Sequence, residues 1–176
     1  KKLDPSGPQP SPRAAHASAS VDPNMIYVYG GAAGGGGLAS DDIFLLDLRS
    51  GEESAKWSIF NTSGSSPGSR YGHTLVFSKP FLLVFGGHIG NEPVNDIWSL
   101  NIEKTNSKWT KIVTKSESPP PRVYHSASMC SAGSATGMMV IFGGRASDQS
   151  PLTDTWGFRR HRDGRWDWVK APYKNN

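Results

Sequence analysis

The sequence contains one cysteine, Cys130, and no apolar run of the roughly 18 residues that a membrane-spanning helix needs. A lone cysteine excludes an internal disulfide and favours a reducing compartment, so we expect an intracellular protein of the cytoplasm or nucleus. The chain starts at Lys1, with no basic segment followed by an apolar one, so we expect neither a secretion signal nor a membrane partner.

Excess charge of one sign is also small. The net charge is +4, from 19 basic and 15 acidic residues spread along the chain, and the isoelectric point is about 9.3. Four excess charges are few for a protein that binds a polyanion, so we do not expect a nucleic-acid partner.

What the sequence does have is turn-forming residues. It contains 20 glycines and 13 prolines, well above their usual combined share of about 12%. Both residues are unfavourable inside helices, so this composition argues against a helical bundle. It is typical of many short strands joined by turns, and it predicts an all-β fold.

Four sequence features recur three times in the same order, at intervals of 52 to 58 residues. The first is Arg-x-x-His, and the second is an apolar run that ends in an aromatic residue and Gly-Gly. The third is Asp-x-aromatic, and the fourth is a basic residue followed by Trp. The Arg-x-x-His feature lies at 13–16, 70–73 and 122–125, and the apolar run with Gly-Gly lies at 26–31, 82–87 and 139–144. Asp-x-aromatic lies at 42–44, 96–98 and 154–156, and the basic residue with Trp lies at 56–57, 108–109 and 165–166.

Each repeat predicts four strands, and a four-stranded unit repeating every 50-odd residues is a propeller blade. The repeat resembles the kelch repeat over nearly the whole chain. The third unit, at 138–145, 154–157 and 159–169, is similar to the serine/threonine phosphatases with kelch-like repeats, which occur in plant brassinosteroid signalling and in apicomplexan parasites. The resemblance implies a non-catalytic interaction segment without a cofactor of its own, and two metal ions in a separate phosphatase domain.

The repeat divides the chain into residues 1–11 as a linker, three blades at 12–60, 61–113 and 114–170, and a tail at 171–176. Propellers have about four to eight blades, so three would form a partial ring. We expect the chain to be part of a longer domain or to self-associate through open blade faces.

If strands alternate in direction, the first strand of each blade starts at the same end as the paired glycines that close the second. That end, the upper rim, is the predicted partner-binding surface, because rim loops carry binding and Arg and Tyr are favoured hot-spot residues. The predicted binding residues are Arg13, Arg70, Tyr71, His88, Arg122, Tyr124 and Arg145. The predicted partners are an acidic or phosphorylated protein segment and the chain's own phosphatase domain. The alternative is that the arginines only brace loops.

Two alternatives to this function remain open. One is a propeller with its own metal-dependent active site, as in kelch-type oxidases and specifier proteins, and the other is an adaptor unrelated to phosphatases. We find no catalytic constellation. The recurring histidines, His16, His73 and His125, are interpreted as buried and hydrogen-bonded within their own blades rather than as zinc ligands.

The densest basic segment is 159–165, with four arginines and His161. It falls between the third and fourth strands of the last blade, at the end opposite the upper rim. We interpret it as a solvated loop or as a contact for an acidic partner, with a nucleic-acid contact as the third alternative.

Overall fold

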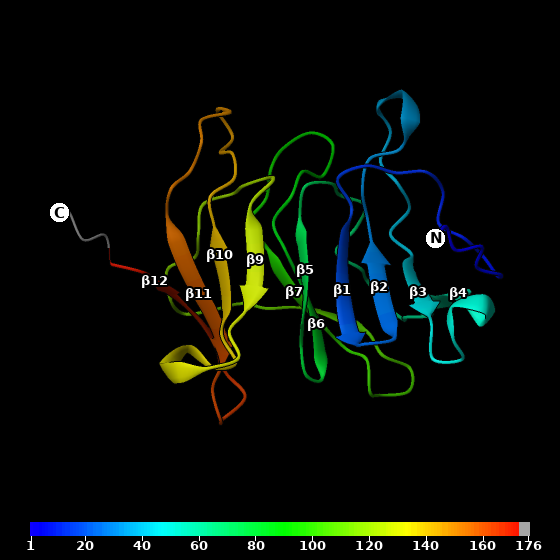
Figure 1. Cartoon of the computed structure of the whole chain (residues 1–176). Coiled ribbons are helices and arrows are strands. Elements are labelled where there is room, and N and C mark those ends of the chain that lie inside the picture. The colour runs from blue at the N-terminus through cyan, green and yellow to red at the C-terminus, as the bar shows by residue number, and fades with distance from the viewer. Residues whose placement is uncertain (173–176) are drawn as a thin grey trace.

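The computed structural model describes residues 1–172 and contains three four-stranded antiparallel sheets, each ordered as in the sequence (Figure 1). The sheets consist of β1 (Ala17–Asp22), β2 (Met25–Tyr29), β3 (Ile43–Asp47) and β4 (Lys56–Phe60); β5 (Thr74–Ser78), β6 (Phe81–Phe85), β7 (Ile97–Asn101) and β8 (Trp109–Lys111); and β9 (Ser126–Met129), β10 (Met139–Phe142), β11 (Thr155–Arg160) and β12 (Trp166–Lys170). The predicted all-β architecture of three four-stranded blades is confirmed.

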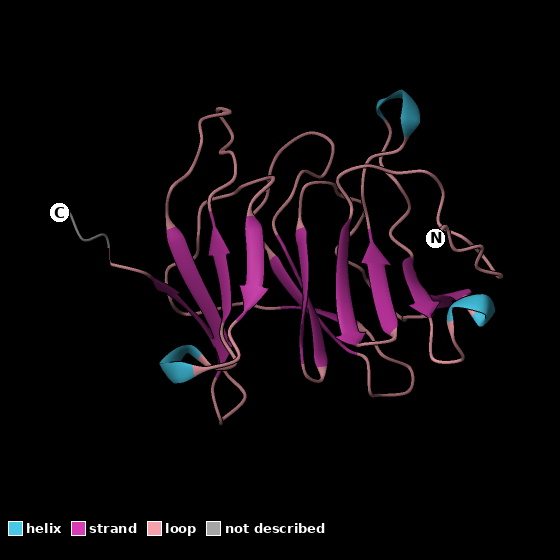
Figure 2. Cartoon of the chain, in the orientation of Figure 1, coloured by secondary structure: helices cyan, strands magenta, loops and turns pink. Residues whose placement is uncertain are grey.

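Helical structure in the described residues is limited to the single 3-10 turns η1 (Gly34–Gly36), η2 (Glu52–Ser54) and η3 (Gly133–Ala135), all in loops (Figure 2). Residues 1–172 include no helix of the length and apolarity needed to cross a bilayer.

The blades stand side by side with their first strands together. Strand β5 packs between β1 and β9, and the later strands of each blade lie progressively farther from this row (Figure 1). The second strand of the middle blade, β6, is therefore covered on both faces, which explains its unbroken apolar sequence. In β6, four of the five residues are buried.

Paired glycines end each second strand because a neighbouring segment passes too close for a side chain. Gly87 has φ +92°, and a Cβ there would lie 2.7 Å from the Cβ of His73 and 2.8 Å from the carbonyl oxygen of Tyr71. Only glycine tolerates both the left-handed conformation and the approach.

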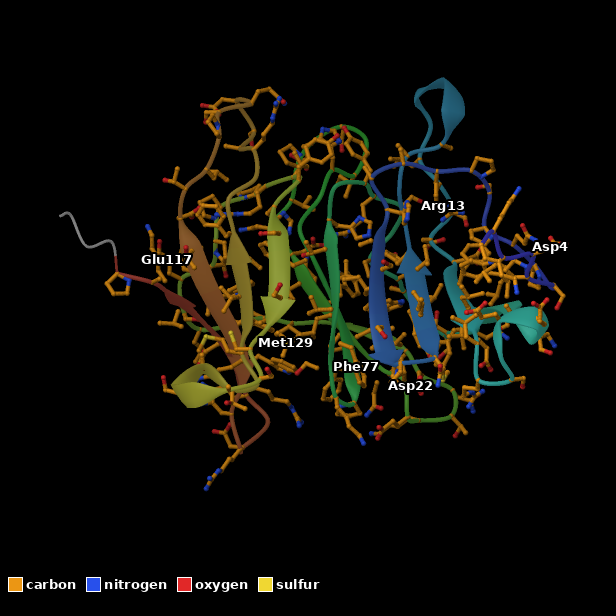
Figure 3. All side chains as sticks on the ribbon, viewed as in Figure 1. Asp4, Arg13, Asp22, Phe77, Glu117 and Met129 are labelled. Atoms are coloured by element: carbon orange, nitrogen blue, oxygen red, sulfur yellow. The ribbon has the colours of Figure 1, made fainter. Side chains whose placement is uncertain are left out.

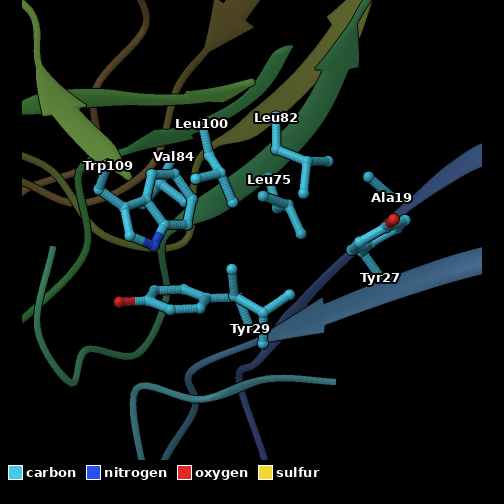
Figure 4. Close-up of a cluster of buried hydrophobic side chains, with 9 residues drawn as sticks. Ala19, Tyr27, Tyr29, Leu75, Leu82, Val84, Leu100 and Trp109 are labelled. Carbon is cyan, nitrogen blue, oxygen red and sulfur yellow. The ribbon is translucent and has the colours of Figure 1, made fainter. Parts of the chain in front are cut away.

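Two apolar cores lie between blades rather than within them. One joins the first two blades through Tyr29 and Trp109, whose ring centroids are 5.6 Å apart (Figure 4). The other joins the last two through Phe85 and Trp168, at 4.9 Å. Each such tryptophan packs on the preceding blade.

The strand register also changes which tryptophan of the third blade belongs to the repeat. Trp57 pairs with Leu46, Trp109 with Leu100, and Trp168 with Phe158. Trp168 is therefore the counterpart of the earlier tryptophans, although the Arg165–Trp166 dipeptide looked closer in sequence. Trp166 instead stacks on Phe158, with the planes 7° apart.

A serine-containing segment before each first strand contacts the fourth strand of the same blade. Ser6 forms a parallel bridge with Lys56, and Ser63 forms one with Lys108. In the last blade, the Ser116 hydroxyl accepts a hydrogen bond from the Trp168 amide. Residues 1–11, predicted as a linker, thus include an edge contact. Of the predicted tail, 173–176 lie outside the described residues.

Each of the two outer blades has one face that no other blade of the described residues covers. The equivalent residues at the junctions between blades are buried. Phe142 is 53% exposed, whereas its counterparts Tyr29 and Phe85 are fully buried. His16 is exposed, whereas His73 and His125 are buried.

Candidate functional site

At the upper rim, the start of the first strand of each blade lies beside the end of the second strand of the same blade. This rim is at the top of Figure 1. Each repeated arginine donates to the carbonyl of the first glycine of its pair. The N···O distances are 3.1 Å for Arg13 to Gly30, 2.9 Å for Arg70 to Gly86 and 3.0 Å for Arg122 to Gly143. Figure 3 labels Arg13 near this end.

Arg70 and Arg122 are buried braces. Arg70 is 1% exposed, and its Nη1 and Nη2 lie 2.7 and 3.1 Å from the two carboxylate oxygens of Asp96. Arg122 is fully buried and forms the same fork with Asp154, at 2.8 and 2.7 Å. The planar guanidinium suits such two-point pairing, and each fork ties the first strand to the third.

A tryptophan two residues beyond each aspartate completes the brace. Trp98 Nε1 donates to Asp96 Oδ2 at 2.8 Å, and Trp156 Nε1 donates to Asp154 Oδ2 at 2.7 Å. Burial raises the pKa of Asp96, but the hydrogen bonds and charge of Arg70 outweigh it and leave the pKa below the usual value. The hydrogen bond from Arg122 likewise lowers the pKa of Asp154.

The first blade lacks this brace: Phe44 stands in place of the tryptophan, and within residues 1–172 Arg13 forms no ion pair with Asp42. Arg13 is only partly buried, and its guanidinium lies over the Phe44 ring, 5.0 Å from the centroid. Its other hydrogen bonds go to Ser11. Burial lowers the pKa of Arg13, and Asp42 partly compensates.

This geometry favours the bracing interpretation of Arg70 and Arg122, because a partner could reach their guanidinium groups only by displacing Asp96 and Asp154. The sequence signal for the brace was present as Asp-x-Trp at 96–98 and 154–156. It became informative only once the strands placed each aspartate beside its arginine.

The remaining predicted site residues lie closer to solvent. The rings of Tyr71 and His88 stack with centroids 5.0 Å apart and planes 18° apart. The ring centroid of Tyr124 lies 6.2 Å from the ring centroid of Tyr71, and Tyr124 is 57% exposed. The exposed Arg145 pairs its backbone with Val123, beside Tyr124. We call Tyr71, His88, Tyr124 and Arg145 the rim cluster.

Tyr124 occupies a strained position. Its φ is +60°, and the equivalent residues of the other blades, Ala15 and Gly72, have φ of +52° and +67°. A hydrogen-bonded row holds all three, from the Gly72 amide to the Ala15 carbonyl at 2.9 Å and from the Tyr124 amide to the Gly72 carbonyl at 2.8 Å. A bulky residue at positive φ is rare, and this tyrosine is exposed as well.

The loops between second and third strands carry more exposed acid than base. Their exposed charged residues are Asp41, Asp42, Glu92, Arg145 and Asp148. Because Arg70 and Arg122 are neutralised internally, this part of the rim is not a basic ring. The acidic or phosphorylated ligand predicted for the rim therefore loses the charge pattern that motivated it.

Two of the three repeated histidines join blades, and His16 is exposed, which corrects the interpretation that each is buried and hydrogen-bonded within its own blade. His73 Nε2 lies 2.9 Å from the carbonyl oxygen of Tyr29, and His125 Nε2 lies 2.9 Å from Thr74 Oγ1, each in the preceding blade. Burial, then the charge of the nearby arginine, lowers the pKa of His73 to about 3 and that of His125 to about 4.

Residues 1–172 contain no group of three or more His, Cys, Asp or Glu side chains arranged to hold a metal ion.

The radial four-stranded blades, the Gly-Gly strand ends and the inter-blade tryptophans define a kelch-type β-propeller segment. A model of the KLHDC2/KLHL20/DRC7 Kelch-repeats domain matches residues 1–175, and the chain belongs to the kelch-repeat family.

Among curated proteins, the chain is 36% identical over 172 residues to serine/threonine-protein phosphatase BSL2 of Arabidopsis thaliana, covering 97% of this chain and 16% of that protein. It is 34% identical over 164 residues to human host cell factor 2, covering 86% and 20%. The chain thus spans a fifth or less of these relatives' lengths. The solved structure of YjhT matches with a TM-score of 0.67 and 19% identity, over 89% of this chain and 45% of that one, which supports the fold.

Proposed function

We propose that the chain is a non-catalytic, protein-binding propeller segment of a serine/threonine protein phosphatase, and that it binds partner proteins through the rim cluster. The similarity to BSL2 over 97% of the chain supports the phosphatase context. In this proposal, the catalytic domain and its two metal ions lie outside these residues. We place the protein inside the cell, where the free Cys130 stays reduced.

The observation that carries the binding proposal is the exposed, strained Tyr124 beside the Tyr71–His88 stack. Tyrosine gives a large, rigid contact surface with little rotamer entropy to lose, and aromatic and arginine side chains dominate interface hot spots. Arg70 and Arg122 act indirectly, because they fix the strand ends on which this cluster stands.

The test has two stages. A photo-crosslinking amino acid is placed at position 124, and in a matched chain at Arg159, which is exposed near the opposite end. Proteins captured only from position 124 are purified, and their affinity for the unmodified chain is measured by calorimetry. The proposal expects a partner specific to position 124; equal capture from both positions contradicts it.

An adaptor unrelated to phosphatases is a second candidate, and the similarity to host cell factor 2 favours it. Both candidates need the same binding rim and differ in what is covalently attached. Sequencing the complete coding region separates them, because the phosphatase proposal requires a metallophosphatase domain in the same chain.

A further inference from the structure

The end opposite the upper rim carries two adjoining hollows between the second and third blades, of about 530 and 310 Å³. Both are lined by Phe81 at the start of β6 and Arg160 at the end of β11. We call them together the lower groove.

The lining of the lower groove is basic and contains no carboxylate. Its titratable side chains are Lys79, Lys104, Lys108, Arg160, His161 and Arg162. His161 is bonded to Asp167 at 2.8 Å, and Lys79 lies 3.8 Å from Glu103. Among residues 1–172, the other four have no carboxylate within ion-pairing distance. The groove therefore offers unneutralised positive charge.

Arg160 is held in place by aromatic rings. Its guanidinium carbon lies 5.1 Å from the Phe81 centroid and 6.0 Å from the Trp166 centroid, and the two rings pack edge to face at 5.6 Å. Such stacking fixes the planar group while leaving its N–H donors free. The neighbouring Asn101, Thr105 and Asn106 add neutral polar groups to the lining.

At the equivalent position between the first and second blades, apolar side chains close the junction. There, Leu45 and Ile102 pack against the inter-blade core beside Met25. The equivalent residues at the second junction, by strand register, are Ser99 and Arg160. Replacing two aliphatic side chains by a hydroxyl and a guanidinium opens the junction and makes it polar.

We propose that the lower groove binds an acidic segment of a partner protein through its aspartate and glutamate carboxylates. The charge complementarity carries this assignment. The cations come from three separate elements and line the groove rather than surrounding one point, which suits several carboxylates along an extended chain. A nucleic acid fits poorly, because Phe81 and Trp166 are packed under Arg160 and offer no free stacking platform for bases.

The test measures fluorescence anisotropy of labelled peptides mixed with the 176-residue chain. The probes are a peptide rich in Asp and Glu, the same peptide with Asn and Gln, one with phosphoserine in place of the acids, and a single-stranded oligonucleotide. We expect salt-sensitive binding of the carboxylate peptide, and none of its amide counterpart. Tighter binding of the oligonucleotide, or binding of the phosphoserine peptide alone, overturns the assignment.

Arg160→Ala and Lys108→Ala locate the binding, and Arg159→Ala is the matched control. Arg159 is also exposed, but it adjoins Arg160 on β11, so its side chain points to the opposite sheet face. Each groove variant should weaken binding about fivefold or more, and the control less than about twofold. The Lys108 side chain is exposed and the bridge from this position to Ser63 uses backbone atoms only, so removing the side chain does not endanger folding. Equal losses in all three variants, or no binding to the unmodified chain, contradict the proposal.

Discussion

Arg70 grips both carboxylate oxygens of Asp96 from inside the second blade, at 2.7 and 3.1 Å, and Trp98 donates to the same aspartate at 2.8 Å. Arg122 and Asp154 repeat the arrangement one blade further on. Arg70 and Arg122 thus stabilise the upper rim through contacts in its buried interior.

Arg70→Met should destabilise the protein by about 3 kcal/mol, because it leaves Asp96 without its counter-charge in a largely buried site. Arg13→Met, in the blade that lacks the fork, should change the free energy of unfolding by less than about 1 kcal/mol. Urea denaturation of both variants measures the difference. Equal losses would show that the fork in the second blade has no special weight.

Trp98→Phe should destabilise the protein by about 1.5 to 3 kcal/mol, because a hydrogen bond to a charged group is lost. The effect should shrink when Asp96 is already Asn, since the two residues act through one contact. A double-mutant cycle of unfolding free energies measures this coupling. Strict additivity would contradict the three-residue brace.

The free energy of unfolding should fall as the pH falls from about 6.5 to about 4. His73 and His125 have folded-state pKa values of about 3 and about 4, so in this range the unfolded chain binds the additional protons. Each histidine contributes a slope of up to about 1.4 kcal/mol per pH unit, and its stabilisation is fully present only above the unfolded pKa.

His73→Gln should flatten this pH dependence, and His16→Gln, at an exposed position, should leave it unchanged. Denaturant titrations at several pH values measure the slopes. An identical slope in the His73 variant would rule out its protonation as the cause.

Phe142 should mediate reversible self-association, because it is 53% exposed where its counterparts in the other blades are buried. Sedimentation velocity over a range of concentrations measures this association. Phe142→Asp should abolish it, whereas Val113→Asp, at a residue 88% exposed elsewhere, should not. A chain that stays monomeric at all concentrations contradicts the prediction.

The sequence predicted the blade architecture because the repeat fixes four strands and a turn signal per unit. Burial of Arg70 could not be predicted, because it depends on the register that places Asp96 beside it. The direction in which Trp109 and Trp168 pack, and the inter-blade bonds of His73, depend on how sheets stack, and the repeat contains no such information. The identity of Trp168 as the third repeat tryptophan was hidden because Arg165–Trp166 matches the pattern of a basic residue followed by Trp two positions earlier.

Two features of the sites were visible in the sequence but could not be interpreted there. Tyr124 stood where the other repeats have Ala15 and Gly72, and only the backbone shows that this position is left-handed. Arg160 lay in an obvious basic run, yet its separation from Arg159 depends on which face of β11 each side chain occupies.

The most direct test of the central claim uses the protein captured only from position 124. Calorimetry measures its affinity for the Tyr124→Gly variant. Glycine occupies the equivalent position at Gly72, and relief of about 1 to 2 kcal/mol of left-handed strain offsets the lost packing and added chain entropy. The free energy of unfolding should therefore change by less than about 1 kcal/mol, and Ala15→Gly serves as control. The rim cluster predicts an affinity reduced about tenfold or more in the Tyr124 variant alone; unchanged affinity in a stably folded variant would contradict it.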